Sequence, residues 1–169
     1  DRDPAWSPDG KSIAYFSDES GEYELCIRGQ DGLGAVRRIR LGAQPTFYYT
    51  PRWSPDGTKL LYSDKQLKLW YVRLDDPKPR LVDSGMFEFF GIAAFDAVWS
   101  PDSRYIAYTR QLTSGQAALF TYSLETSTAM QLSDGMSDVR YPAFDADGRY
   151  LYFTASTDVA LTVQGLDMS

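Results

Sequence analysis

Four aspartates recur at nearly equal spacing and are the first residues of this chain that could do chemistry. They are Asp9, Asp56, Asp102 and Asp147. Carboxylates can bind Ca²⁺ or transfer a proton as a general acid or base. A catalytic group is needed once, however, whereas a turn is needed in every copy of a structural repeat. We therefore interpret the four aspartates as turn residues and predict no catalytic residue and no metal site among them.

The residue types on which most hydrolases depend are missing from the sequence. It contains no histidine and one cysteine, Cys26. A Ser/His/Asp triad, a His-ligated zinc or a Cys/His pair therefore cannot be built from this chain alone. Cys26 lies in the apolar run 25–27, where a buried thiol is the expected state. We predict that the chain is not itself an enzyme and carries no cofactor.

The aspartates belong to an internal repeat that indicates the fold. Trp-Ser-Pro-Asp occurs at 6–9, 53–56 and 99–102, and a weaker copy, Phe-Asp-Ala-Asp, occurs at 144–147. The aromatic residues that open these copies are 47, 46 and 45 residues apart. A period of about 40 to 50 residues is typical of a four-stranded propeller blade.

Each copy of the repeat predicts the same series of strands. An apolar strand ends at the aromatic residue, and Ser-Pro-Asp-Gly then makes a tight turn, because proline presets φ and glycine takes the left-handed conformation. A second strand, a polar loop and a third strand follow, and the short fourth strand is charged, as suits an exposed sheet edge. No segment has helical periodicity over a helical length. The third strands are expected at 24–27, 68–72 and 118–122, and the fourth strands at 36–39, 80–82 and 130–132.

We therefore predict an all-β fold, a partial β-propeller of about three and a half four-stranded antiparallel blades within one domain, 1–169. The blades are expected at 3–41, 48–83 and 96–133, with a partial blade at 141–169. Closed propellers have 4 to 8 blades. We expect the open blade faces to be covered by remaining blades of a longer parent chain, or by a second copy in a homodimer.

The charge of the chain argues against two classes of partner. Acidic residues outnumber basic residues by 23 to 17, and a net charge of −6 repels phosphate backbones and anionic lipid surfaces. We predict no nucleic acid partner and no membrane association, and the compartment stays open between cytoplasm and periplasm. Arg37, Arg38 and Arg40 form a local basic cluster, which we interpret as a solvated edge because it falls on a predicted outer strand.

Two links between blades are rich in aromatic residues. A loop from an outer strand to the next inner strand passes near the central channel, where aromatic side chains can grip an extended peptide. The alternative is that these rings pack on missing blades or neighbouring domains, since large apolar patches mark interfaces. The candidates for contact with peptides or a protein partner are Phe47, Tyr48, Tyr49, Phe87, Phe89 and Phe90.

Longer stretches of the sequence resemble one family. Trp-Ser-Pro-Asp-Gly alone is shared by propellers of TolB, the prolyl oligopeptidases and the tricorn proteases, so it indicates fold and not function. Tyr-Tyr-Thr-Pro-Arg-Trp-Ser-Pro-Asp-Gly at 48–57, with Leu-Trp-Tyr-Val at 69–72, is similar to the tricorn-type serine peptidases. The stretches 122–126, 132–138 and 153–162 are similar again. The resemblance covers nearly the whole chain.

This resemblance implies a role that the repeat by itself does not show. Tricorn-type peptidases carry two N-terminal propellers, a PDZ domain and catalytic domains with a serine nucleophile assisted by histidine. The chain resembles part of the second propeller. The resemblance implies a non-catalytic segment that binds or gates peptides for a catalytic domain elsewhere in the parent chain, and no catalytic residue of the family falls in the matched segment. The alternative is a TolB-like interaction scaffold that is not attached to an enzyme.

Overall fold

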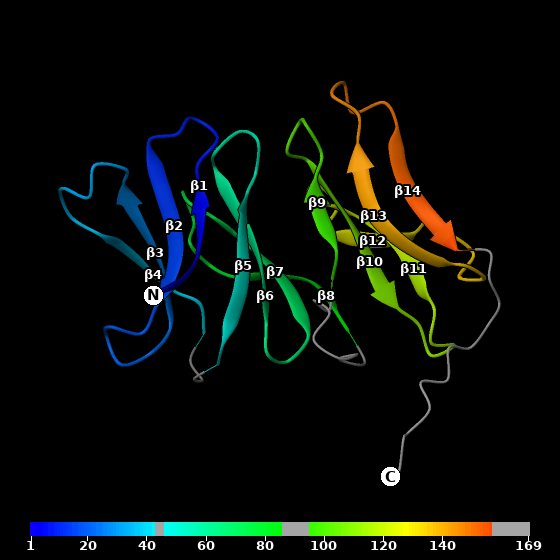
Figure 1. Ribbon diagram of the computed structural model, residues 1–169, viewed down its shortest axis with the longest axis horizontal. Helices are drawn as coiled ribbons and strands as arrows, with labels where there is room; N and C mark the ends of the chain where they lie inside the picture. The colour runs from blue at the N-terminus through cyan, green and yellow to red at the C-terminus, as the bar shows by residue number, and fades with distance from the viewer. Residues whose placement is uncertain (43–45, 86–94, 157–169) are drawn as a thin grey trace, which may run out of the picture.

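The computed structural model describes residues 1–42, 46–85 and 95–156. Within these ranges the chain forms fourteen strands and no helix, and thus no helix that could cross a membrane. Figure 1 shows the strands as four sheets placed side by side in chain order. The prediction of an all-β, partial-propeller fold is confirmed.

The four sheets, here called blades 1 to 4, are antiparallel, and in each the strands follow chain order. Blade 1 consists of β1 (Arg2–Trp6), β2 (Ser12–Ser17), β3 (Glu24–Gly29) and β4 (Arg37–Arg40). Blade 2 consists of β5 (Tyr48–Trp53), β6 (Lys59–Asp64), β7 (Lys68–Arg73) and β8 (Arg80–Ser84). Blade 3 consists of β9 (Ala97–Trp99), β10 (Tyr105–Gln111), β11 (Ala117–Ser123) and β12 (Thr128–Gln131). The described part of blade 4 consists of β13 (Asp138–Phe144) and β14 (Leu151–Ser156).

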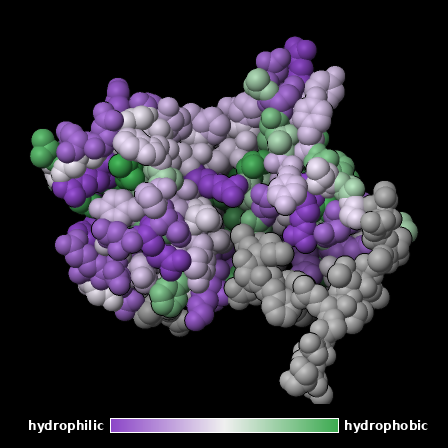
Figure 2. Space-filling model, viewed as in Figure 1, coloured by the Kyte–Doolittle hydropathy of each residue, from purple (hydrophilic) through white to green (hydrophobic). Residues whose placement is uncertain are grey.

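The second strands hold the blades together because they are apolar on both faces. Successive side chains of a strand point to opposite faces. Leu60 and Tyr62 of β6 therefore join the core between blades 1 and 2, which also contains Phe16. Leu61, on the opposite face of β6, joins the core between blades 2 and 3 with Ile106. The face shown in Figure 2 is mainly hydrophilic, in keeping with apolar cores that lie between the blades.

The tryptophans of the repeat join each blade to the blade before it. Trp53 Nε1 donates to the backbone oxygen of Ala5 at 3.0 Å, and Trp99 Nε1 donates to that of Arg52 at 3.1 Å. In both cases the acceptor immediately precedes the aromatic residue of the neighbouring blade. Trp53 and Trp99 are thus structural contacts between blades.

The turn of blade 3 has Ser103 where the other three turns have glycine. Ser103 adopts a left-handed φ of 59° and is 1% exposed. Its Oγ accepts the backbone N–H of Asp56 in blade 2 at 3.0 Å. The hydrogen bond to the neighbouring blade therefore offsets the strain that a side chain meets at this position.

Ser103→Ala is expected to lower the free energy of unfolding by about 1–2 kcal/mol, because the strain stays and the amide of Asp56 loses its acceptor. Ser103→Gly is expected to stay within about 1 kcal/mol of the parent chain, because relief of the strain offsets the lost bond. Urea denaturation of both variants measures the difference. Equal stability of the two variants would contradict this account.

Candidate functional site

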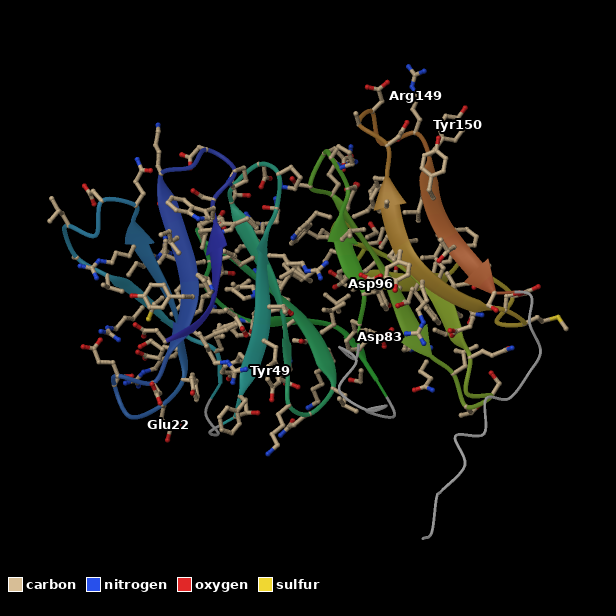
Figure 3. The ribbon with its side chains drawn as sticks, in the orientation of Figure 1. Glu22, Tyr49, Asp83, Asp96, Arg149 and Tyr150 are labelled. Atoms are coloured by element: carbon tan, nitrogen blue, oxygen red, sulfur yellow. The ribbon has the colours of Figure 1, made fainter. Side chains whose placement is uncertain are left out.

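The two ends of the blades differ in the residues that they present. In Figure 3, Glu22 and Tyr49 lie at one end, and Arg149 and Tyr150 lie at the opposite end. Glu22 belongs to the loop between β2 and β3, and Tyr49 lies near the start of β5. We call this end the loop end, and the end with the Ser-Pro-Asp turns the turn end. The sequence-predicted aromatic residues that the structure describes lie at the start of β5 and thus belong to the loop end.

Phe47 is the exposed member of the predicted set. Its side chain is 41% exposed, and its ring lies 5.3 Å from the ring of Tyr23, measured between centroids. Lys65 donates its backbone N–H to the Phe47 oxygen at 2.9 Å and places its Nζ 5.5 Å from the Phe47 ring centroid. The loop end therefore presents an aromatic pair beside an ammonium group.

Tyr49 forms a second aromatic and cationic pair. The Arg2 guanidinium lies 4.9 Å from the centroid of the half-buried Tyr49 ring. Arg2 also pairs with Asp3 at 3.6 Å, and the Asp3 carboxylate accepts the N–H of Thr50 at 3.3 Å. Rings and cations of this kind can hold apolar and acidic side chains.

Tyr48 takes a different position from its two neighbours. It is 4% exposed, and its ring centroid lies 5.6 Å from those of Phe16 and Tyr62. Burial raises the pKa of its hydroxyl above the usual range. Tyr48 therefore belongs to the core between blades 1 and 2. Phe87, Phe89 and Phe90 lie outside the described residues.

Sequence reasoning missed the partners that complete the loop-end site. Tyr23 comes from the loop before β3, Lys65 from the turn between β6 and β7, and Arg2 from β1. Tyr23 and Arg2 belong to blade 1, so no local pattern joins them to the aromatic residues of blade 2. Lys65 lies across the β5–β6 hairpin from Phe47, so hairpin pairing could have found it. The separation of Tyr48 from Tyr49 could have been predicted, because neighbouring strand residues point to opposite faces.

The first strands of three blades carry a bulge, and those of blades 1 and 2 also carry residues of the site. Asp3, Thr50 and Tyr141 each have a positive φ, of 52°, 48° and 55°, and each precedes a proline. The pairing register shifts at these places. The Asp96 carboxylate accepts the N–H of Tyr141 at 2.8 Å, as that of Asp3 accepts the N–H of Thr50. Because proline and bulges disrupt pairing, these edges are poor templates for an added strand.

The turn carboxylates are engaged in hydrogen bonds. Asp9, Asp56 and Asp102 each accept the hydroxyl of the serine two residues earlier at 2.6 Å. These bonds lower the pKa of Asp9 and Asp102. Burial alone would raise the pKa of Asp56, but bonds from Lys59 and Ser54 outweigh it and hold the pKa well below the usual range. The three carboxylates are thus ionised at neutral pH and hold the turns.

Metal and thiol chemistry find no support in the described part of the chain. Among the described residues there is no group of three or more His, Cys, Asp or Glu side chains that could hold a metal ion. Cys26 is buried, and burial raises the pKa of its thiol. A thiol in this state is a poor nucleophile.

The low pKa of Asp56 predicts a loss of stability in acid. Its folded pKa is below the unfolded value of about 4, so its contribution is complete above about pH 4 and is lost as the pH falls through the folded pKa. We expect the urea midpoint to fall from about pH 4 downwards, and to fall less steeply in Asp56→Asn. Equally steep curves for both proteins would show that another group is responsible.

Comparison with known proteins identifies relatives over most of the chain. No protein-family model matches it. It is 31% identical over 157 residues to a tricorn-like protease C-terminal subunit of Sulfurisphaera tokodaii, a match that covers 88% of this chain and 16% of the relative. It is 32% identical over 147 residues to a tricorn protease homologue of Saccharolobus solfataricus, covering 80% of this chain and 12% of the relative. The chain therefore spans less than a fifth of each of these two relatives.

Solved structures share the arrangement of the blades. The crystal structure of the tricorn protease superposes with a TM-score of 0.73 at 21% identity, covering 86% of this chain and 14% of that one. A TolB from Agrobacterium tumefaciens superposes with a TM-score of 0.61 at 21% identity, covering 90% of this chain and 52% of that one. The fold thus defines the chain as part of a β-propeller. The sequence relatives and the tricorn superposition together identify it as a propeller segment of the tricorn type.

Proposed function

We propose that the chain is a non-catalytic propeller segment of a tricorn-like serine peptidase, which binds or gates peptide substrates for a catalytic domain elsewhere in the parent chain. The observation that carries this proposal is the identity above 30% to a tricorn-like protease C-terminal subunit and to a tricorn protease homologue, over 88% and 80% of the chain. The absence of histidine from the sequence supports the assignment of hydrolysis to another domain.

The loop end supports contact with peptides. It presents the exposed ring of Phe47 with Lys65 beside it, and the Tyr49 ring with Arg2 beside it. Aromatic rings offer apolar area to peptide side chains, and the cations suit carboxylates. The bulged first strands disfavour strand addition, so recognition through side chains fits this surface better.

Fluorescence anisotropy with labelled, unstructured twelve-residue peptides tests the proposal. We expect the double variant Phe47→Ala/Tyr49→Ala to weaken binding by about tenfold or more, because two aromatic contacts are lost. Tyr150→Ala is the matched control, since Tyr150 is an exposed aromatic residue, 63% exposed, at the turn end. The chain alone should not cleave the peptides. Equal binding by the double variant and the control would contradict the proposal, and absence of binding would favour the TolB-like scaffold.

The open face of blade 1 is a candidate surface for contact with other domains or with a second copy of the chain. Trp6 is 59% exposed, whereas its counterparts Trp53 and Trp99 donate to a neighbouring blade. A groove of about 400 Å³ beside Ile13 and Tyr15 lies on the same face. We infer that remaining blades or catalytic domains of the parent chain cover this face, and that a second copy takes their place in the isolated chain.

Light scattering over a concentration series measures this self-association. The mass is expected to rise from 19.1 kDa toward twice that value, and Trp6→Ala is expected to keep the chain monomeric. If the unsubstituted 169-residue chain stays monomeric at every concentration, the homodimer is contradicted.

A further inference from the structure

A groove of about 570 Å³ lies between blades 1 and 2 at the turn end, away from the loop-end site. Trp53, Ile27 and Leu74 provide its apolar lining, and Arg37 and Asp9 are among its charged residues. Its volume falls within the range of small-ligand sites, about 300–1,000 Å³. We call it the turn-end groove.

The same place is filled between blades 2 and 3. The strand registers align Ile27 and Arg37 of blade 1 with Tyr71 and Arg80 of blade 2. The Tyr71 ring packs edge-on against Trp99, with ring centroids 6.5 Å apart, and the Arg80 guanidinium lies 5.7 Å from the Tyr71 centroid. The groove therefore exists where an isoleucine replaces a tyrosine.

The arginine has a carboxylate partner at the interface between blades 2 and 3, and it has none among the described residues at the interface between blades 1 and 2. Arg80 pairs with Asp76 at 2.6 Å. Asp76 is the fifth residue after Tyr71. The fifth residue after Ile27 is Gly32, which has no carboxylate. In the part of the chain that the structure describes, the Arg37 guanidinium forms no ion pair and donates to the backbone oxygen of Leu74.

The two acidic residues of the groove have donors within their own turns. Asp56 is paired with Lys59 and accepts the hydroxyl of Ser54. Asp9 accepts the hydroxyl of Ser7 and the backbone N–H of Lys11. These bonds engage both carboxylates, and Arg37 remains available for an external carboxylate.

We propose that the turn-end groove binds the C-terminal aromatic residue of a peptide. The aromatic ring occupies the place that Tyr71 has in the next interface, against Trp53, and the terminal carboxylate pairs with Arg37 as Asp76 pairs with Arg80. The proposal rests on the proposed function, because it names the class of peptide that the segment binds, but it assigns that peptide to a different surface.

The test compares three N-terminally labelled tetrapeptides by fluorescence anisotropy. They are Ala-Ala-Ala-Phe with a free carboxylate, the same peptide with an amidated end, and Ala-Ala-Ala-Ala with a free carboxylate. The first is expected to bind at least about tenfold more tightly than either of the others, because it alone supplies both the ring and the charge.

Two variants locate the binding, and a third is the matched control. Ile27→Tyr fills the groove with the residue of the next blade, and Arg37→Gln removes the charge; each is expected to weaken binding about tenfold or more. Arg40→Gln removes a charge from the same strand, at a side chain that is 88% exposed and does not line the groove, and is expected to bind normally. Thermal unfolding confirms that each variant is folded.

Equal affinity for the acid and the amide, or unchanged binding by Ile27→Tyr, would overturn the groove proposal. If binding is then lost in Phe47→Ala/Tyr49→Ala, the loop end is the peptide site and the proposed function stands without the groove. If none of the tetrapeptides binds but the twelve-residue peptides do, the groove proposal again fails alone. If no peptide of either length binds, both proposals fail.

Discussion

Replacing Asp83 by alanine is expected to lower the free energy of unfolding by about 3 kcal/mol at pH 7. Asp83 lies in β8 of blade 2, and its side chain is 13% exposed. It accepts the hydroxyl of Tyr108 at 2.6 Å and binds Arg110 Nη1 at 2.9 and 3.0 Å, both from β10 of blade 3. Alanine would leave a buried phenol and a half-buried guanidinium without their acceptor.

Urea denaturation of Asp83→Ala measures this effect, and Asp75→Ala is the matched control. Asp75 also pairs with an arginine, Arg73, but its side chain is 67% exposed and that of Arg73 is 47% exposed. An exposed pair contributes little, so the control is expected to lose far less stability than Asp83→Ala. A loss in Asp83→Ala no larger than that of the control would show that this cluster does not join blades 2 and 3.

Two equivalent tyrosines are expected to respond differently to replacement by phenylalanine. Tyr62 and Tyr108 occupy the same place in successive blades, and burial raises the pKa of both hydroxyls. Tyr108 donates to Asp83, whereas the Tyr62 hydroxyl is buried without a hydrogen-bond partner among the described residues. The registers place Ile39 in blade 1 where blade 2 has Asp83, which explains the difference.

Tyr108→Phe is therefore expected to lower the free energy of unfolding by about 2 kcal/mol, since Asp83 loses a donor. Tyr62→Phe is expected to leave it unchanged or raise it by about 1 kcal/mol, because an unsatisfied buried hydroxyl is removed. Urea midpoints at constant m-value give both changes. Shifts of equal size and sign in the two variants would contradict the account, since only one hydroxyl has an acceptor.

Most of the fold could be predicted because its signals are local. The serine, proline and aspartate of the turns in blades 1 to 3 are consecutive in the sequence, and the turn before Lys11 is held by bonds of Ser7 and Asp9 to their near neighbours. The expected third and fourth strands coincide with observed strands, although β12 begins at Thr128 instead of residue 130. Its four residues are all exposed, so no buried side chain marked its start in the sequence.

The candidate site could be predicted only in part. Phe47 and Tyr49 lie at the loop end, but Tyr48 points into the core between blades 1 and 2. Strand alternation explains this difference, but the rule can be applied only when β5 is known to begin at Tyr48. Tyr23 reaches Phe47 from the neighbouring blade, so its contribution depends on how the blades pack. Lys65 lies across the β5–β6 hairpin from Phe47, so its position follows from the pairing of that hairpin.

The repeat, the turns and the all-β class follow from the sequence alone, because they depend on residues that are close in the chain. Whether side chains fill the space between two blades depends on how the blades pack. Ile27 and Tyr71 occupy equivalent places, but only packing against the next tryptophan shows that one leaves a groove and the other closes it. The hydrogen bonds between blades described above join residues 25 to 48 positions apart, and such contacts leave no local pattern in a sequence.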